Sequence, residues 1–262
     1  MRRRTGRVLT ALLAVTGALV VLLIAARLFP YHSLNHDEGV YLRQAGLLRA
    51  GQFSLYPPLE GVFRPWFFVD AGERLYPKYG PVPAAMFALG QAVGATRLVL
   101  AGIAGGIIAL TVGVVGAAFE RRTGLAAAAV LLCSPLFLIN TSVFLPYAPT
   151  ALWNLAFAFA YFRADRTGDR RFAAVAGLAV GIAFFSRPYT AVVFAAPFLC
   201  HACWTLWQNP RSAFPRQAVT AAMGLLGVAA TLGYNTAVTG AALQFPYEAF
   251  APLDGLGFGQ RR

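Results

Sequence analysis

The sequence is short of charge, and shortest of lysine. Only 12% of its 262 residues are charged, whereas 58% are hydrophobic. A water-soluble domain usually carries about 25% charged residues. Lys78 is the only lysine, so arginine carries nearly all of the positive charge. The shortage of charge excludes an ordinary soluble domain, and we interpret the chain as an integral membrane protein.

Acidic residues and cysteines are scarce as well. Ten acidic residues stand against 22 basic ones, which gives a net charge of +12. In a soluble protein this excess would suggest nucleic acid. Here no DNA- or RNA-binding motif occurs, and the arginines cluster at the ends of apolar runs, as in membrane proteins. We therefore expect no nucleic-acid partner. The three cysteines lie in apolar runs, where small apolar side chains are ordinary.

Apolar runs long enough to cross a bilayer recur along the chain. The first follows four arginines and is longer than the apolar core of a signal peptide, which predicts a signal anchor with a cytoplasmic N-terminus. The runs together predict an all-α integral membrane protein with about seven transmembrane helices, its C-terminus extracytoplasmic. The predicted spans are residues 8–26, 97–118, 125–145, 150–162, 172–185, 189–206 and 218–238.

The chain divides into four predicted parts. Residues 1–29 form the signal-anchor span, 30–80 the first extracytoplasmic loop, 81–238 a multi-span membrane domain and 239–262 an extracytoplasmic tail. Apolar residues at helical spacing over 37–50 predict an interfacial helix in the loop, which Gly51 ends. The run after Pro81 is too short to cross alone and predicts a re-entrant or interfacial helix. The loop and the tail are expected on one side, where they can meet.

Two adjacent carboxylates open the predicted interfacial helix. Asp37 and Glu38 lie near the outer boundary, where such a pair suits a general base, a metal ligand or both. A structural interpretation competes with this, because Asn35 and Glu38 resemble a capping box and first-turn acids complement the helix dipole. The local sequence leaves both interpretations open.

Two basic residues and one further acid are candidates for binding. Lys78 lies near the predicted headgroup plane, where an ammonium can hold a lipid phosphate or simply extend from a span end to water. Arg187 lies between two apolar runs, a position that is a functional candidate by default and also an ordinary hairpin tip. Asp254 lies in a glycine-rich part of the tail that loop flexibility explains equally well.

Two short motifs resemble the membrane glycosyltransferases of the GT-C superfamily, in particular the protein O-mannosyltransferase and aminoarabinose-transferase-like group (glycosyltransferase family 39). They are H-D-E-G-V-Y at 36–41 and Y-P-K-Y-G-P at 76–81, with a weaker match in G-L-A-V-G at 177–181 followed by Arg187. The resemblance covers roughly residues 8–206. It implies a multi-pass protein of the bacterial plasma membrane.

The resemblance also implies a reaction and its residues. The donor would be a polyprenyl-phosphate-linked sugar, and the acceptor a glycan, lipid or protein on the extracytoplasmic face. Asp37 would be the catalytic base with Glu38 in support, and Lys78 and Arg187 would bind the donor phosphate. No cofactor is expected, although a divalent cation stays an open alternative. Candidates for the acceptor side or a second wall of the site are Tyr76, Arg64 and Asp254.

Two other classes of function stay open. A membrane transporter or lipid-binding protein would place ionisable residues near mid-span and repeat its topology, and the sequence shows neither feature. An inactive fragment or assembly subunit is the other alternative, because members of the family usually have more spans than this chain. A transferase is the interpretation that accounts for the acidic pair and the lysine together.

Overall fold

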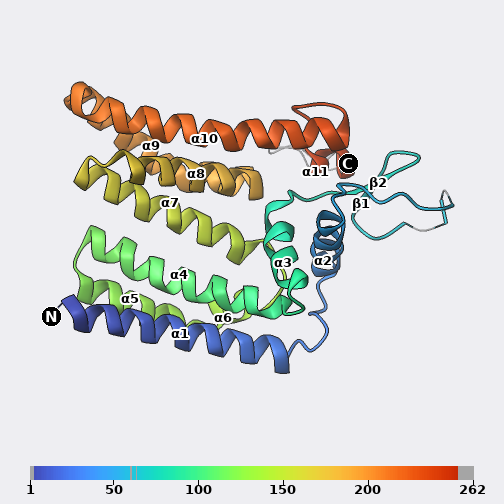
Figure 1. The fold of residues 1–262 in the computed structure, drawn as a ribbon, viewed down its shortest axis with the longest axis horizontal. Coiled ribbons are helices and arrows are strands. Elements are labelled where there is room, and N and C mark those ends of the chain that lie inside the picture. Colours follow the sequence, from blue (N-terminus) through green and yellow to red (C-terminus); the bar gives the residue numbers. More distant parts are fainter. Residues whose placement is uncertain (1–2, 60, 63, 253–262) are drawn as a thin grey trace, which may run out of the picture.

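The computed structural model describes residues 3–59, 61–62 and 64–252. Within these residues the chain forms eleven α-helices and one sheet of two short antiparallel strands. The prediction of an all-α protein is confirmed at this level. The long helices lie side by side with similar axis directions, and the short elements gather at one end of them (Figure 1).

Four helices are long and apolar enough to cross a membrane, and a bent pair can count as a fifth. The bend of 71° falls between α5 and α6, where Ser134 caps α6 and Pro135 begins it, so the predicted span 125–145 is broken in the middle. Helices α7 and α8 occupy two further predicted spans without meeting the same criteria. The helix layer consists of α1 (Arg3–Arg27), α4 (Thr96–Ala118), α5 (Arg121–Leu132), α6 (Pro135–Thr141), α7 (Tyr147–Thr167), α8 (Arg170–Ser186), α9 (Pro188–Gln208) and α10 (Pro210–Thr239).

Large apolar side chains cover much of the outer surface of these helices. Leu12 and Leu19 of α1, Val193 of α9 and Leu225 of α10 are all more than half exposed. A soluble monomer rarely exposes so much apolar surface. The exposure therefore fits helices whose outer faces contact lipid, in agreement with an integral membrane protein.

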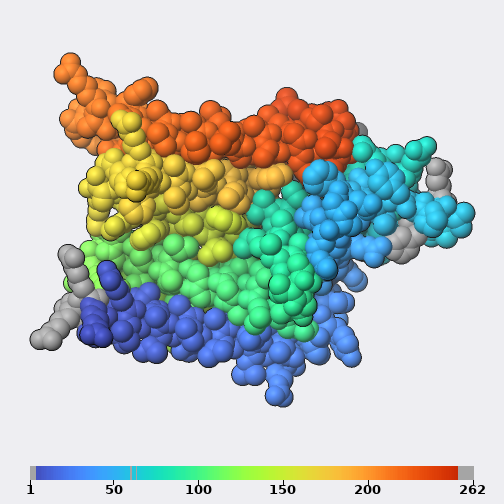
Figure 2. All heavy atoms as spheres, in the orientation of Figure 1, coloured from blue at the N-terminus to red at the C-terminus, as the bar shows by residue number. Residues whose placement is uncertain are grey.

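The short elements form a cap at one end of the helix layer. They are α2 (His36–Arg49), β1 (Phe68–Asp70), β2 (Leu75–Pro77), α3 (Val82–Ala92) and α11 (Pro246–Phe250). The beginning of α1 lies at the opposite end (Figure 1). Figure 2 shows the segment between α2 and β2 projecting beyond the ends of the long helices. Helix α2 matches the predicted helix 37–50, and Gly51 follows its end with a φ of 71°.

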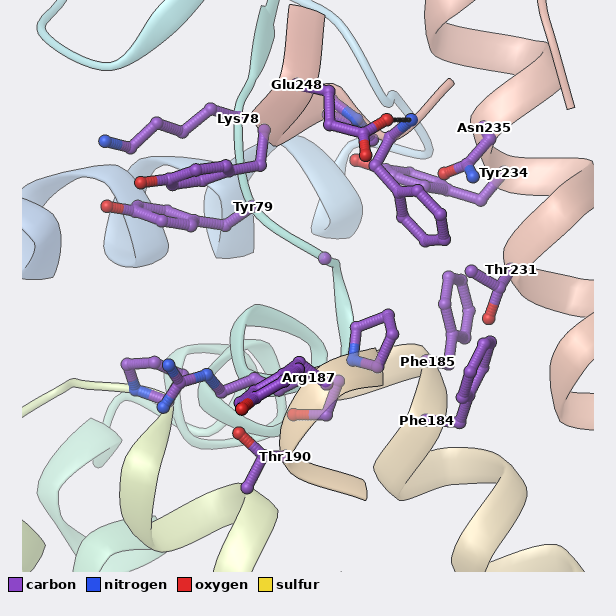
Figure 3. Close-up of a pocket in the computed structure, with 18 of the residues that line it drawn as sticks. Lys78, Tyr79, Phe184, Phe185, Arg187, Thr190, Thr231, Tyr234, Asn235 and Glu248 are labelled. Atoms are coloured by element: carbon purple, nitrogen blue, oxygen red, sulfur yellow. Dashed lines mark hydrogen bonds between the residues drawn. The ribbon is translucent and has the colours of Figure 1, made fainter. Parts of the chain in front are cut away.

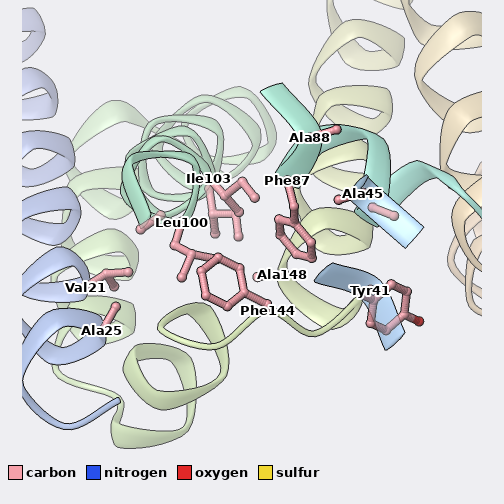
Figure 4. Close-up of a cluster of buried hydrophobic side chains, with 13 residues drawn as sticks. Val21, Ala25, Tyr41, Ala45, Phe87, Ala88, Leu100, Ile103, Phe144 and Ala148 are labelled. Atoms are coloured by element: carbon pink, nitrogen blue, oxygen red, sulfur yellow. The ribbon is translucent and has the colours of Figure 1, made fainter. Parts of the chain in front are cut away.

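A buried apolar cluster joins the cap to the long helices (Figure 4). Phe87 of α3 is fully buried between Tyr41 of α2 and Phe144 of the segment before α7, and its ring meets both edge-on. Edge-to-face pairs of buried aromatic rings contribute beyond the area they bury. This cluster fixes the rotation of α2 and so determines which of its residues face inward.

The first loop and the tail meet within the cap, as predicted. The Arg74 guanidinium donates hydrogen bonds to the carbonyl oxygens of Ala237 and Val238, near the C-terminus of α10, at 3.2 Å each. The rings of Phe67 and Phe250 lie 5.6 Å apart, edge to face. A helix C-terminus leaves carbonyl groups that a basic side chain can satisfy. The ring contact holds α11 over the first loop, and the Arg74 bonds tie the loop to the end of α10.

Candidate functional site

A cavity of about 840 Å³ lies between the cap and the ends of the long helices. Its walls come from segments far apart in the sequence: the first turn of α2, the chain after β2, the start of α7, the turn between α8 and α9, the end of α10, and α11. Three of the sequence-predicted site residues, Asp37, Lys78 and Arg187, line this cavity. In Figure 3, Lys78 and Tyr79 lie on one side, Arg187 and Thr190 lie below them, and α10 forms the far wall.

Asp37 is held at the cavity by its own backbone and by a tyrosine. Its N–H donates to the side chain of Asn35, the residue that caps α2. Its carboxylate also acts on the neighbouring phenol of Tyr79, whose pKa it raises. The Tyr79 ring stacks on Tyr41, one helical turn beyond Asp37, with 4.8 Å between centroids and 15° between planes. Asp37 is therefore a partly exposed carboxylate, and α2 and the chain after β2 together define its position.

Glu38 points away from this cavity and is fully buried. Its two carboxylate oxygens accept hydrogen bonds from the backbone N–H groups of Ser33 and Phe144, each at 2.7 Å. Buried carboxylates are stable when such donors satisfy them. Glu38 thus ties the chain before α2 to the segment before α7, and any support it gives Asp37 is structural. Asn35 caps α2 through Asp37, not by a reciprocal pair with Glu38.

Aromatic rings surround the ammonium group of Lys78, a residue that is only 7% exposed. The nitrogen lies 3.5 Å from the centroid of Phe67, 4.6 Å from Phe250, 4.9 Å from Tyr79 and 5.4 Å from Tyr247. The faces of aromatic rings attract cations, and the attraction is stronger away from water. We call these four rings the aromatic cage. It orders a cation beside the cavity with groups from both the loop and the tail.

Phe67 adopts an unusual backbone conformation in this cage. Its φ is +60°, the one positive φ among the described non-glycine residues. Its carbonyl accepts a hydrogen bond from the Lys78 N–H at 3.1 Å. A bulky residue in this region is strained by about 1–3 kcal/mol, and such residues concentrate at functional sites. The strained residue is thus the one whose ring lies closest to the Lys78 ammonium group.

Arg187 comes from the sharp connection between two long helices. It ends α8 and precedes α9, which Pro188 begins. Its guanidinium lies 4.9 Å from the centroid of the Tyr147 ring. Among the described residues Arg187 forms no ion pair, whereas Arg64 and Arg216 do. Within the described part of the chain, its charge therefore lies beside the cavity without an ion-pair partner.

Gly80 allows the chain after β2 to pack closely on the end of α8. A Cβ at this position would lie 2.7 Å from the carbonyl oxygen of Phe185 and 3.0 Å from that of Ser186. Real Cβ atoms do not approach backbone so closely. The absence of a side chain thus lets the Lys78 segment pack directly on the end of α8, next to Arg187.

The remaining predicted residues lie elsewhere. Arg64 forms an exposed ion pair with Asp70 at 2.8 Å. Tyr76 is buried in a cluster with Tyr234 and Val238, and burial raises the pKa of its phenol. Asp254 lies outside the described residues. Neither Arg64 nor Tyr76 lines the cavity.

Several lining residues were missed by sequence reasoning. Tyr79 lies in the motif at 76–81 without a predicted role, and no pattern in the sequence points to Tyr147, Asn235, Tyr247 or Glu248. A tyrosine in a membrane protein is an ordinary interfacial residue, so its type gives little signal. The tail does supply a wall, through α11.

The tyrosines beside Asp37 stay protonated at neutral pH. Burial raises the pKa of Tyr79 far above its ordinary value, and the neighbouring Asp37 carboxylate raises it further. Burial likewise raises the pKa of Tyr41, partly offset by the positive charge of Arg187. Both phenols can therefore act only as neutral donors or acceptors.

The described residues contain no group of three His, Cys, Asp or Glu side chains placed to hold a metal ion. Asp37 is one carboxylate at the cavity, and Glu38 uses both oxygens on backbone N–H groups.

Comparisons with protein-family models, with curated proteins and with solved structures give no match to the chain.

Proposed function

We propose that the chain is a multi-pass membrane glycosyltransferase of the GT-C type, which moves a sugar from a polyprenyl-phosphate-linked donor to an acceptor glycan, lipid or protein. One observation carries the proposal: Asp37, Lys78 and Arg187 line a single cavity although 150 residues of sequence separate the first from the last. A carboxylate and two cations in one cavity suit a transfer in which an acceptor loses a proton and a phosphate departs.

The proposed reaction is a single displacement. The acceptor oxygen attacks the anomeric carbon of the sugar while the Asp37 carboxylate accepts the proton of the attacking hydroxyl group. The bond between that carbon and the phosphate oxygen breaks, and the oxygen keeps the electron pair. Lys78 and Arg187 stabilise the negative charge on the departing polyprenyl phosphate. The configuration at the anomeric carbon is inverted.

The arginines support an orientation in the membrane. Arg121 and Arg122 begin α5, and Arg170 and Arg171 begin α8, at the ends of these helices away from the cap (Figure 1). Under the positive-inside rule these ends face the cytoplasm. We infer seven crossings, with α5 and α6 as one broken span, α2 and α3 at the outer surface, and the cavity on the extracytoplasmic face of a bacterial plasma membrane.

The surface of α9 supports a lipid-linked donor. Tyr189 and Val192 line the cavity and are 70% and 53% exposed. We infer that the cavity opens along α9 towards the lipid. A polyprenyl chain can leave between these residues while its phosphate stays near Lys78 and Arg187.

Transfer assays test the proposal directly. Membranes containing the wild type, Asp37→Asn or Lys78→Gln are supplied with undecaprenyl phosphate carrying a hexose, a pentose or an amino-pentose. Asp37→Asn is expected to lower turnover by about 10²–10⁴-fold, the usual contribution of a general base. Glu73→Gln is the matched control, since Glu73 is an exposed carboxylate of the same loop that does not line the cavity.

The outcome separates the classes of function. Wild-type turnover in both Asp37→Asn and Lys78→Gln would exclude the proposed site. Movement of the lipid-linked sugar across vesicles without covalent transfer would instead identify a transporter. Mass spectrometry of the lipid-linked sugars that accumulate when the gene is deleted would identify the donor.

A further inference from the structure

We propose that Phe67 and Phe250 are positioning residues for the donor phosphate, because their rings hold the Lys78 ammonium group beside the cavity. Phe67 comes from the first loop, and Phe250 ends α11 in the tail. In a site of the proposed function these rings keep the phosphate-binding cation in place, so the inference rests on that function. The tail then belongs to the phosphate-binding side of the cavity.

A lysine side chain needs such support to bind an anion at a fixed place. Its ammonium group lies at the end of a flexible four-carbon stem, and ordering that stem costs conformational entropy. Lys78 lines the cavity and is buried, and its nitrogen lies 3.5 Å from the centroid of Phe67 and 4.6 Å from that of Phe250. The entropy is therefore lost when the protein folds and not when the donor binds, which favours affinity and charge stabilisation.

The backbone places Phe67 directly beside Lys78. The Phe67 carbonyl oxygen accepts a hydrogen bond from the Lys78 N–H at 3.1 Å, and their neighbours Phe68 and Pro77 pair in the sheet. The φ of Phe67 is +60°, a conformation that glycine adopts without strain and phenylalanine does not. Glycine would leave the ammonium group without its closest ring. The need for that ring accounts for a strained residue at this position.

Phe250 joins the tail to the same cation. Its ring meets the Phe67 ring edge to face at 5.6 Å, so the two closest rings of the aromatic cage also contact each other. Tyr247 and Glu248 of the same short helix line the cavity. A movement of α11 would therefore change the cavity wall and the surroundings of Lys78 together.

The aromatic cage leaves Lys78 able to bind a phosphate. Ring faces attract a cation through their quadrupole, without a strong directed hydrogen bond. An ammonium group has three N–H donors, and charge-assisted bonds to phosphate oxygens are the stronger kind. A phosphate in the cavity can therefore accept hydrogen bonds from the nitrogen while the rings keep that nitrogen in place.

Graded fluorination of Phe67 is the discriminating change. Each fluorine withdraws electrons from the ring face and weakens its attraction for a cation, while the size and shape of the ring stay almost the same. The kcat/KM for the undecaprenyl-phosphate sugar that the wild type uses is expected to fall stepwise from one to three fluorines, by about tenfold at the end of the series. The KM for the acceptor should stay unchanged. A ring that only fills space would show no such gradient.

The same series at two other positions gives the comparison. At Phe250, whose ring lies farther from the nitrogen, the fall should have the same direction and be smaller. Phe53 is the matched control, since it is a phenylalanine of the first loop that does not line the cavity, and its ring contacts Tyr234 and not Lys78. Fluorination of Phe53 should leave kcat/KM unchanged.

A second measurement does not depend on activity. Lys78 is the only lysine, so an amine-reactive acylating reagent modifies one side chain, and mass spectrometry of the peptides separates it from the N-terminal amine. Trifluorination of Phe67 and the variant Phe250→Leu should each raise the rate of this modification several-fold, because a less firmly held amine meets the reagent more often. Undecaprenyl phosphate should slow the modification of the wild type.

The outcomes separate this inference from the proposed function. If Lys78→Gln keeps full turnover and undecaprenyl phosphate gives no protection, the proposed phosphate site fails, and the inference fails with it. If Lys78→Gln is impaired while kcat/KM shows no gradient with fluorination of Phe67, only the role of the rings is wrong. Faster modification without that gradient would overturn it as well, because the rings would then hold the lysine without serving the donor.

Discussion

Helices α8 and α10 run side by side, yet they meet differently along their length. In the middle, Gly177 and Gly181 of α8 face Gly224 and Gly227 of α10, and a Cβ at Gly227 would lie 2.3 Å from the Cα of Gly181. We call these four residues the glycine seam. Toward the cap, Phe185 of α8 and the end of α10 line the cavity instead.

The difference shows how one pair of helices can be rigid and still enclose a site. Small residues let helix backbones touch, and this contact replaces the hydrophobic effect as a source of stability between helices in lipid. Large aromatic side chains at the cap end, such as Phe184 and Tyr234, hold the helices apart around the cavity. The glycine seam should therefore control stability, and the cavity residues should control activity.

Among the variants that compare these two regions, the largest effect is expected from Arg187, where the seam helix α8 ends at the cavity. Arg187→Gln removes one of the two cations proposed to stabilise the departing phosphate, so kcat should fall by about 10²–10³-fold. Arg211→Gln, at the exposed start of α10 away from the cap, is the control. Equal activity of the two variants in the transfer assay would mean that Arg187 contributes nothing to chemistry.

Gly80 lies where the cap meets α8 and tests whether spacing matters at the cavity. Gly80→Ala would bring a Cβ within 2.7 Å of the Phe185 carbonyl oxygen and push the Lys78 segment away from the end of α8. Misplacement by about 1 Å can lower turnover by up to about 10²-fold. The melting temperature in detergent is measured alongside, and the loss of turnover should persist at temperatures where the variant is fully folded. Gly39→Ala is the control, because a Cβ there meets nothing within 4 Å.

The glycine seam itself should respond in the opposite way. Gly227→Val forces the helices apart and should destabilise the protein by roughly 1–3 kcal/mol, the usual range for overpacking. Thermal unfolding in detergent measures it, with Gly233→Val as the control, since a Cβ at Gly233 has open space. A folded fraction of Gly227→Val that retains wild-type kcat would support the separation of the two regions. An unchanged melting temperature would contradict it.

The smallest effect concerns ionisation of the cavity tyrosines. Because burial raises the pKa of Tyr79 and of Tyr41 above the ordinary 10.0, neither should form phenolate as the pH rises through that value. An unfolded chain ionises at about pH 10, so this contribution to stability is present below pH 10 and is lost only as the pH rises further. Absorbance titration of the wild type against Tyr79→Phe measures it; an early difference signal at pH 10 would show that Tyr79 is exposed.

Local patterns in the sequence predicted most of the elements. The apolar runs gave the positions of the long helices, and Gly51 marked the end of α2. The break between α5 and α6 was missed, because Pro135 inside an apolar run is compatible with a kink as well as with a break. The interfacial placement of α2 and α3 stays a prediction.

The candidate site was predictable only in part. Asp37, Lys78 and Arg187 could be found because a charge between apolar runs stands out in such a sequence. Glu38 carries the same charge as Asp37 but faces the interior, since neighbouring residues on a helix point about 100° apart. Tyr79 could not be found, because a tyrosine beside a span is commonplace and its interaction with Asp37 depends on a partner 42 residues away.

By itself the sequence determined that lipid surrounds much of the chain and that the long segments are helices. Long apolar runs favour lipid as their surroundings, and a backbone in lipid must form helices to satisfy its own hydrogen bonds. The tertiary structure alone decided which polar residues share a cavity. Glycines set how closely α8 and α10 approach, and the Phe87 cluster sets the rotation of α2. Those distances depend on packing between segments far apart in the chain, and so no local pattern contains them.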